Sequence, residues 1–259
     1  MRLVAGAVAL ALQLVSSGAG GETAPTGEAV LEKARAVLSG VRDKSMRVTM
    51  RVRAPSGDER VRILRGYEKH DPEARKVLWI FDSPQELEGT GFLAWQNEGS
   101  PDSLWVYFPG QRRVRRVPPS IRRENFQGSM FTYEDLVAVF FLDFEGTHRL
   151  EGESEYGESR CWIVETTLPE GEFAYRRLRT SIDRETRLPT RVDFYADGLL
   201  KTMLVTRTEI VGGIPTILEV EMRSPTDGYR TLVELAEIDY NRGLADNLFT
   251  IEHLSQMGD

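Results

Sequence analysis

The chain has 259 residues, which is enough for one large domain or two small ones. Hydrophobic residues make up 41% of it and charged residues 28%, as in an ordinary globular protein. The formal net charge of −7 argues against nucleic-acid binding, which favours a basic domain. The single cysteine, Cys161, can form no internal disulfide, and its place beside Trp162 in an apolar strand predicts a buried thiol without catalytic activity.

The first residues have the pattern of an export signal. Arg2 precedes an apolar run over residues 3–15, and residues 17–19 are the small side chains that a signal peptidase requires. The run is short for a membrane span, and a retained anchor helix is the alternative interpretation. No cysteine follows it, which argues against a lipoprotein signal. We expect a cleaved signal peptide at residues 1–19, a flexible segment at 20–27 and export to the periplasm.

An amphipathic helix is predicted over residues 28–41, where apolar residues recur at helical spacing. Strand patterns follow at once, beginning with Met46, Val48 and Met50, which alternate with polar residues. A period of two predicts strands with one packed face and one face in water. Such strands are predicted at about 46–53, 59–69, 76–81, 90–96, 103–108, 112–117, 147–153, 160–168, 175–183, 190–195, 200–211, 216–223 and 229–240, before a closing helical turn at 246–249.

A long antiparallel meander of roughly a dozen strands tends to curl into a barrel or half-barrel. We therefore predict an α+β fold dominated by β structure, namely an antiparallel half-open β-barrel with capping helices, in one domain over residues 28–259. Its concave apolar face must be filled by the protein's own helices or by a ligand. The candidate residues for lining this cavity are Trp95, Trp105, Tyr107, Phe126, Met130, Phe131 and Phe140.

The residues around Thr132 carry several signals of a helix start. Thr132 is a candidate N-cap, and Asp135 lies at the spacing of a reciprocal capping box. Phe131 and Leu136 have the spacing of a hydrophobic staple, which fixes the angle at which the chain enters a helix. These signals predict a short helix over residues 133–141.

Six arginines and no acidic residue lie between Arg112 and Arg123. A solvated surface is the simplest interpretation, and nucleic-acid binding is disfavoured by the net charge. The third interpretation is binding of an anionic head group or an acidic partner, because the planar guanidinium group can bind phosphate through two hydrogen bonds. The candidate residues for this role are Arg112, Arg113, Arg115 and Arg116.

The usual signs of catalysis or of a bound metal are weak. The three histidines, His70, His148 and His253, have no spacing that would pair them as ligands. No Gly-x-Ser-x-Gly elbow, P-loop or dinucleotide fingerprint occurs. Glu134 and Asp135 could be read as paired carboxylates, but adjacent helical residues do not face each other. We predict no metal, no cofactor and no enzymatic activity.

Three segments together resemble the LolA-like outer-membrane lipoprotein-sorting proteins. They are residues 105–109, residues 112–117 and above all residues 126–136, which contain the Gly-Ser-x-Phe-Thr-Tyr-Glu-Asp segment of one branch of that family. The resemblance implies an unclosed half-barrel, capped by helices, with a hydrophobic cavity. It also implies a periplasmic carrier that transfers acyl chains without chemistry, and it suggests an RND-type inner-membrane exporter as a partner. Such carriers use a cavity arginine to regulate lid opening, and Arg113 and Arg115 are candidates because they share one strand face.

The leading functional hypothesis is a monomeric carrier that takes lipid or lipoprotein acyl chains to the outer membrane. One acyl chain would give useful affinity, at roughly 0.8 kcal/mol per buried CH₂ group. The predicted helices over residues 28–41 and 133–141 would form the lid of the cavity. The alternative is a protein-binding envelope-stress regulator on the same fold, and a third hypothesis, an enzyme, lacks a catalytic constellation.

Overall fold

The computed structural model describes residues 24–38, 40–71, 74–97, 101–138, 142–157, 159–171 and 173–256. The expected signal peptide lies outside these residues. The described chain forms one antiparallel sheet of 13 strands, in the order β6-β5-β4-β3-β2-β1-β13-β12-β11-β10-β9-β8-β7. The strands are β1 (Asp43–Arg53), β2 (Glu59–His70), β3 (Ala74–Ser83), β4 (Gly91–Asn97), β5 (Ser103–Phe108), β6 (Arg113–Arg116), β7 (Thr147–Tyr156), β8 (Ser159–Thr167), β9 (Arg177–Asp183), β10 (Pro189–Tyr195), β11 (Leu199–Val211), β12 (Ile214–Arg223) and β13 (Arg230–Tyr240).

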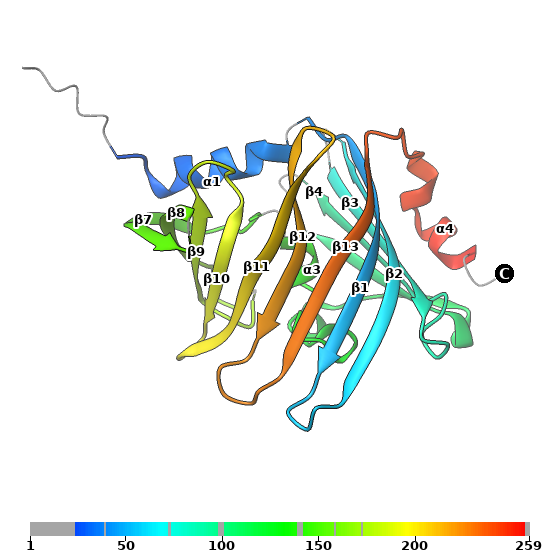
Figure 1. The fold of residues 1–259 in the computed structure, drawn as a ribbon. Coiled ribbons are helices and arrows are strands. Elements are labelled where there is room, and N and C mark those ends of the chain that lie inside the picture. Colours follow the sequence, from blue (N-terminus) through cyan, green and yellow to red (C-terminus); the bar gives the residue numbers. More distant parts are fainter. Residues whose placement is uncertain are drawn as a thin grey trace, which may run out of the picture.

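Two meanders meet at the centre of this sheet. Strands β1 to β6 and β7 to β13 each pair with their neighbours in sequence, and the pairing of β1 with β13 joins the two halves. Strands β6 and β7 are the two ends of the sheet and do not pair with each other. The sheet is therefore curved but not closed (Figure 1), which confirms the predicted half-open barrel.

The alternation that predicts β1 separates an apolar inner face from a charged outer face. Val48 and Met50 are fully buried in the main hydrophobic cluster. On the opposite face, the Arg51 guanidinium group lies 3.2 Å from the carboxylate of Glu234 on β13. Such exposed pairs contribute little to stability, so we assign the stability of the sheet to its inner face.

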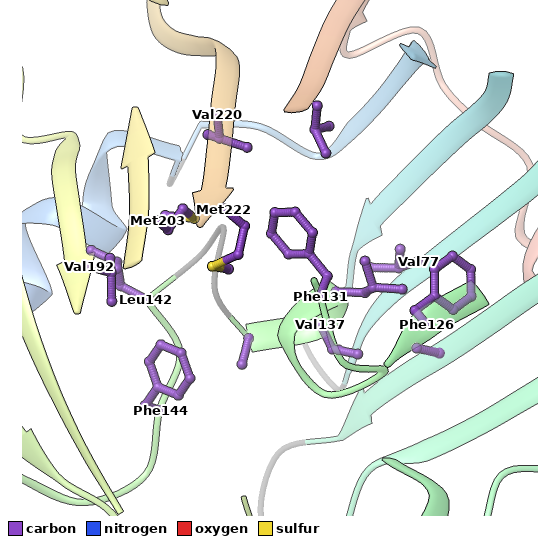
Figure 2. Packing of buried hydrophobic residues seen from close by; sticks show 14 of the residues in the cluster. Val77, Phe126, Phe131, Val137, Leu142, Phe144, Val192, Met203, Val220 and Met222 are labelled. Carbon is purple, nitrogen blue, oxygen red and sulfur yellow. The ribbon is translucent and has the colours of Figure 1, made fainter. Parts of the chain in front are cut away.

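The long connection between β6 and β7 covers the inner face of the sheet. We call its described residues, 118–138 and 142–144, the plug. It contains α2 (Pro119–Arg122), the 3₁₀ turn η3 (Phe126–Gly128) and α3 (Asp135–Ala138). Figure 2 shows Phe131 and Val137 of the plug among side chains of the sheet such as Met222. The inner face is thus covered by the chain itself.

The helix predicted over residues 133–141 begins two residues later than expected: residues 133–134 form a turn and α3 starts at Asp135. Residues 139–141, and with them Phe140, lie outside the described residues. The predicted helix over 28–41 is present in shortened form. It starts one residue earlier, with Thr26 as N-cap, as α1 (Gly27–Arg35), and continues as the 3₁₀ turn η1 (Ala36–Leu38). Helix α1 packs against β7 and β8 at one end of the sheet (Figure 1).

A second hydrophobic cluster lies on the outer face of β3, β4 and β5. It is covered by the 3₁₀ turn η5 (Asp246–Phe249) and by α4 (Ile251–Gln256), through Phe249 and Leu254. Figure 1 shows α4 outside the curved sheet, on the side opposite α3. Consecutive residues from Val77 to Phe81 are all buried, because β3 is covered on both faces.

Candidate ligand-binding site

The start of α3 contains both hydrogen bonds of a capping box. The backbone N–H of Thr132 donates to Oδ2 of Asp135 at 2.6 Å, and the backbone N–H of Asp135 donates to the Thr132 hydroxyl at 3.1 Å. The motif therefore has the geometry that its spacing predicts. Both side chains are buried, so the cap lies inside the protein.

The carboxylate of Asp135 also joins the plug to two parts of the barrel wall. The Lys201 ammonium group, on β11, forms an ion pair with Oδ2 of Asp135. The Tyr175 hydroxyl, from the β8–β9 connection, donates to Oδ1 at 2.9 Å. Lys201 also donates to the backbone carbonyl of Met130 in the plug at 3.2 Å and lies 5.0 Å from the centre of the Phe194 ring. A lysine and a tyrosine of the wall thus hold one carboxylate of the plug.

The apolar surroundings of Asp135 affect the protonation of Tyr175 and the strength of the ion pair with Lys201. Burial raises the pKa of Tyr175 well above its ordinary value, and the negative charge of Asp135 raises it further. The tyrosine therefore remains a hydrogen-bond donor. The ion pair is deeply buried, since the side chains of Lys201 and Asp135 are 4% and 0% exposed. A buried ion pair adds little net stability, but separating its members is costly, so we infer that this pair mainly fixes where the plug sits.

Arg62 on β2 makes a second polar contact between wall and plug. It is 6% exposed and donates to the backbone carbonyl of Gln127. Among the described residues, its Nε and Nη1 atoms are buried without a hydrogen-bond partner. Burial lowers the pKa of Arg62, and the nearby Arg60 lowers it further. Gln127 and Gly128 both have left-handed backbone, with φ of 48° and 71°, which forms the sharp turn containing this carbonyl.

Arg75 on β3 holds the far end of the plug. It donates to the Val137 carbonyl, and its Nη1 atom lies 4.0 Å from the carboxylate of Asp143. Burial lowers its pKa to about 10. A pocket of about 270 Å³ opens beside it, where the plug meets the end of the first helix. Its lining residues are Ala34, Arg35, Val37, Leu38, His70, Arg75, Leu142, Asp143, Leu188 and Pro189.

The structure brings together only some of the predicted cavity residues. Phe126 and Phe131 are buried in the inner cluster, and Met130 packs against it. The placement of Trp95, Trp105 and Tyr107 on the same face is wrong, because these three belong to the outer cluster under α4. Both faces of β4 and β5 carry apolar residues, so aromatic side chains alone do not indicate which face is concave.

The predicted arginine cluster lies on the surface. Arg112, Arg113, Arg115 and Arg116 are all exposed, on or just before the edge strand β6. Arg113 and Arg115 pair with Phe108 and Val106, whose side chains belong to the inner face. Arg113 and Arg115 therefore do share one strand face, on the inner side of the sheet, but they lie at its exposed rim. Contacts with the plug come instead from the buried Arg62 and the largely buried Arg75.

Sequence reasoning missed Lys201, Tyr175 and Arg62. The sequence did contain a signal that could have identified Arg62 and Lys201. Arg62 is two residues from Leu64, and Lys201 is two residues from Met203, so each cation shares a strand face with a core residue.

Among the described residues, no group of three or more metal-binding side chains occurs. The part of the chain that the structure describes also contains no helix long and apolar enough to cross a membrane.

This half-open antiparallel barrel matches the fold of LolA-like lipoprotein-sorting proteins, as two solved structures show. A putative outer membrane lipoprotein-sorting protein domain from Vibrio parahaemolyticus aligns with a TM-score of 0.83 and 22% identity, over 89% of this chain and 98% of that one. A LolA superfamily protein from Nitrosomonas europaea aligns with a TM-score of 0.68 and 17% identity, over 89% and 100% of the two chains.

A DUF1329 family protein from Desulfovibrio piger has 27% identity and a TM-score of 0.82, over 88% of this chain and 98% of that one. A family model with the description "Uncharacterized protein" matches residues 73–256, which is more than half of the chain. The chain therefore belongs to that DUF1329-like family. No curated protein sequence matches it.

Proposed function

We propose that this protein is a periplasmic carrier that binds acyl chains of lipids or lipoproteins on its inner face and takes them to the outer membrane without enzymatic chemistry. Export by a cleaved signal peptide, a monomeric state and an RND-type inner-membrane exporter as a partner are parts of the same proposal. The observation that carries it is an open, curved sheet whose apolar inner face is covered by one long connection, the plug, and at its β7–β8 end by α1. Cargo would occupy that face after the plug moves.

Two features support a movable plug. Its helices are short, with α2 (Pro119–Arg122) and α3 (Asp135–Ala138) each about one turn, so little regular structure is lost when it moves. Its contacts with the wall also include discrete polar links, through Arg62, Arg75 and Lys201. The hydrogen bonds of Arg62 and Arg75 to plug carbonyls can be exchanged for water when the plug leaves. The buried Lys201–Asp135 ion pair and the apolar inner face need a replacement of their own kind, an anion and an apolar chain.

Acyl chains are the replacement that the inner face favours. The cluster to be covered again includes Phe194, Met203 and Met222, all fully buried in the closed state. At roughly 0.8 kcal/mol per CH₂ group, a long acyl chain could compensate for uncovering part of it. The pocket of about 270 Å³ where Leu142 meets the first helix is the place at which we expect a chain to enter.

Native mass spectrometry of the protein purified gently from the periplasm tests the cargo directly. Co-purifying lipid or acylated protein, identified by its mass, is the expected result. A mass without any bound molecule that persists after incubation with a lipid extract would contradict the carrier proposal. That result would favour the alternative, a regulator that binds another envelope protein.

A reversible disulfide between the plug and the sheet tests whether the plug must move. The backbone N–H of Met130 lies 2.9 Å from the Thr231 hydroxyl on β13, so cysteines at these positions are close enough for a disulfide to be tried. In a Cys161→Ser background, Met130→Cys/Thr231→Cys should bind lipid when reduced and lose binding when oxidised. Each single cysteine variant is the matched control. Equal binding in the oxidised and reduced states would show that the plug need not leave.

A further inference from the structure

The Asp135 carboxylate occupies a site that the barrel wall forms without help from the plug. Oδ2 is bound by the Lys201 ammonium group and Oδ1 by the Tyr175 hydroxyl. The two donors come from β11 and from the β8–β9 connection, so they remain in the wall when the plug moves. Each oxygen of one carboxylate thus has its own donor from the wall.

Aromatic rings surround these donors. The Lys201 ammonium group lies 5.0 Å from the centre of the Phe194 ring and 5.6 Å from that of Tyr175. The rings of Tyr175 and Phe194 pack edge to face at 4.9 Å. Rings attract a cation only weakly compared with a carboxylate, so they cannot replace the ion pair. The site combines a cation, a hydroxyl donor and an apolar wall.

We propose that Lys201 and Tyr175 form the head-group site of the carrier, and that an acyl chain with a carboxylate or phosphate group binds there in place of Asp135. This inference rests on the proposed function, because the site becomes free only when the plug leaves. In the closed protein, the Asp135 carboxylate of the plug occupies the position of the anionic head group, and the Phe131 ring of the plug covers apolar surface that the acyl chain would cover.

The electrostatics favour an anionic cargo over a neutral one. When the plug leaves, Lys201 loses its ion pair with Asp135 and its hydrogen bond to the Met130 carbonyl. A cation left without an anion in an apolar pocket is costly. An anionic head group restores both the ion pair and the Tyr175 hydrogen bond, whereas the hydroxyl of a neutral alcohol can accept a hydrogen bond but leaves the ion pair unmade.

Arg62 is not part of this head-group site. It lies on β2, and strands β1, β13 and β12 separate β2 from β11. Its hydrogen bond is to the Gln127 carbonyl, a neutral acceptor. We therefore assign Arg62 to holding the plug and assign selection of the head group to Lys201 and Tyr175.

Three probes with the same chain length test the inference, namely dodecanoate, dodecyl phosphate and dodecanol, each kept below the concentration at which it aggregates. Binding to the full-length exported protein is measured by titration calorimetry. We expect at least one anion to bind about tenfold or more tightly than dodecanol, as a charge-assisted hydrogen bond can provide. Whichever of dodecanoate and dodecyl phosphate binds more tightly indicates whether the site favours a carboxylate or a phosphate head group.

Substitutions test which residues cause the preference for anions over dodecanol. Asp135→Asn removes the competing carboxylate and should tighten anion binding, whereas Asp135→Asn/Lys201→Met should remove the preference for anions. Tyr175→Phe should weaken that preference while keeping the aromatic ring. Arg113→Met, which removes an exposed cation at the rim, is the matched control and should change nothing. Circular dichroism checks that each variant is folded, and the wild-type comparison does not depend on any of them.

The outcomes separate the two proposals. If dodecanol binds wild type as tightly as both anions, the head-group site is wrong and the carrier proposal stands. Loss of the anion preference in Arg113→Met but not in Asp135→Asn/Lys201→Met would also overturn the head-group site, because it would assign the effect to the rim. If none of the three probes binds, the carrier proposal fails and the inference fails with it.

Discussion

The hydroxyl of Tyr175 donates a hydrogen bond of 2.9 Å to Asp135, which links the wall of the barrel to the plug. Both residues are almost completely buried. The Tyr175 ring has separate contacts, with Phe194 at 4.9 Å and Phe173 at 5.4 Å between ring centres. The packing of the ring and the hydrogen bond of the hydroxyl can therefore be tested independently.

Tyr175→Phe should lower the free energy of unfolding by about 1.5–3 kcal/mol, because it removes a hydrogen bond to a buried carboxylate and keeps the ring. Urea denaturation measures the change. Tyr156→Phe is the matched control, since Tyr156 is 38% exposed, and should change stability by less than about 0.5 kcal/mol. Equal small effects of the two substitutions would mean that the hydroxyl of Tyr175 does not hold the plug.

Lys201→Met should cost about 3–5 kcal/mol, because it leaves the Asp135 carboxylate buried without its counter-ion. The double variant Lys201→Met/Asp135→Leu should recover most of that loss, since it replaces both charges with apolar side chains. The two single variants and the double variant form a thermodynamic cycle that gives the coupling energy. Additive effects would contradict a direct ion pair between these residues.

The strands could be predicted from sequence because each obeys a local rule. Met46, Val48 and Met50 alternate with polar residues, and the same alternation places them in the inner cluster of the structure. The capping box at Thr132 and Asp135 is also local, since it depends on a spacing of three residues. Such signals need no knowledge of the rest of the fold.

The ion pair of the plug could not be predicted in this way. Asp135 and Lys201 are separated by 66 residues, and their meeting depends on the path of the plug over β11. The faces of β4 and β5 were ambiguous for a related reason. Trp95 and Trp105 contribute to the outer cluster because the C-terminal helix, which has only a weak sequence signal, happens to cover that face.

The contact of η5 and α4 with the outer face should contribute substantially to stability. Phe249 is 1% exposed and packs in the outer cluster, and its backbone carbonyl accepts a hydrogen bond of 2.9 Å from the Trp95 indole. Phe249→Ala should cost about 3–5 kcal/mol, measured by urea denaturation, because it leaves a cavity beneath the helix. The native tryptophan emission should shift to longer wavelength as Trp95 becomes more exposed.

Ile210→Ala is the control for Phe249→Ala, because Ile210 is 65% exposed and its loss should be nearly neutral. Lipid binding gives a second control. The outer cluster is separate from the plug, so Phe249→Ala should leave the relative affinities for dodecanoate and dodecanol unchanged. A change in that ratio would show that the two faces of the sheet are coupled.

Two histidines should make the stability of the protein depend on pH. Burial lowers the pKa of His70 and of His148 below the ordinary value of 6.5, and in His148 this outweighs the attraction of Glu28. The unfolded chain therefore binds protons at a higher pH than the folded chain does. Stability contributed by the neutral histidines is complete above a pH of about 6.5 and is lost as the pH falls below it towards the folded pKa values.

Urea denaturation at a series of pH values between about 5 and 8 tests this dependence. The free energy of unfolding should rise with pH in that range, and His70→Gln/His148→Gln should flatten the rise. Glu165 provides a separate comparison at lower pH, since hydrogen bonds from Arg149 and Arg177 lower its pKa below the ordinary value of 4.5. Its contribution is lost only as the pH falls below about 4.5. A rise between pH 5 and 8 that is the same in wild type and in the double variant would exclude the two histidines as its cause, because only they were removed.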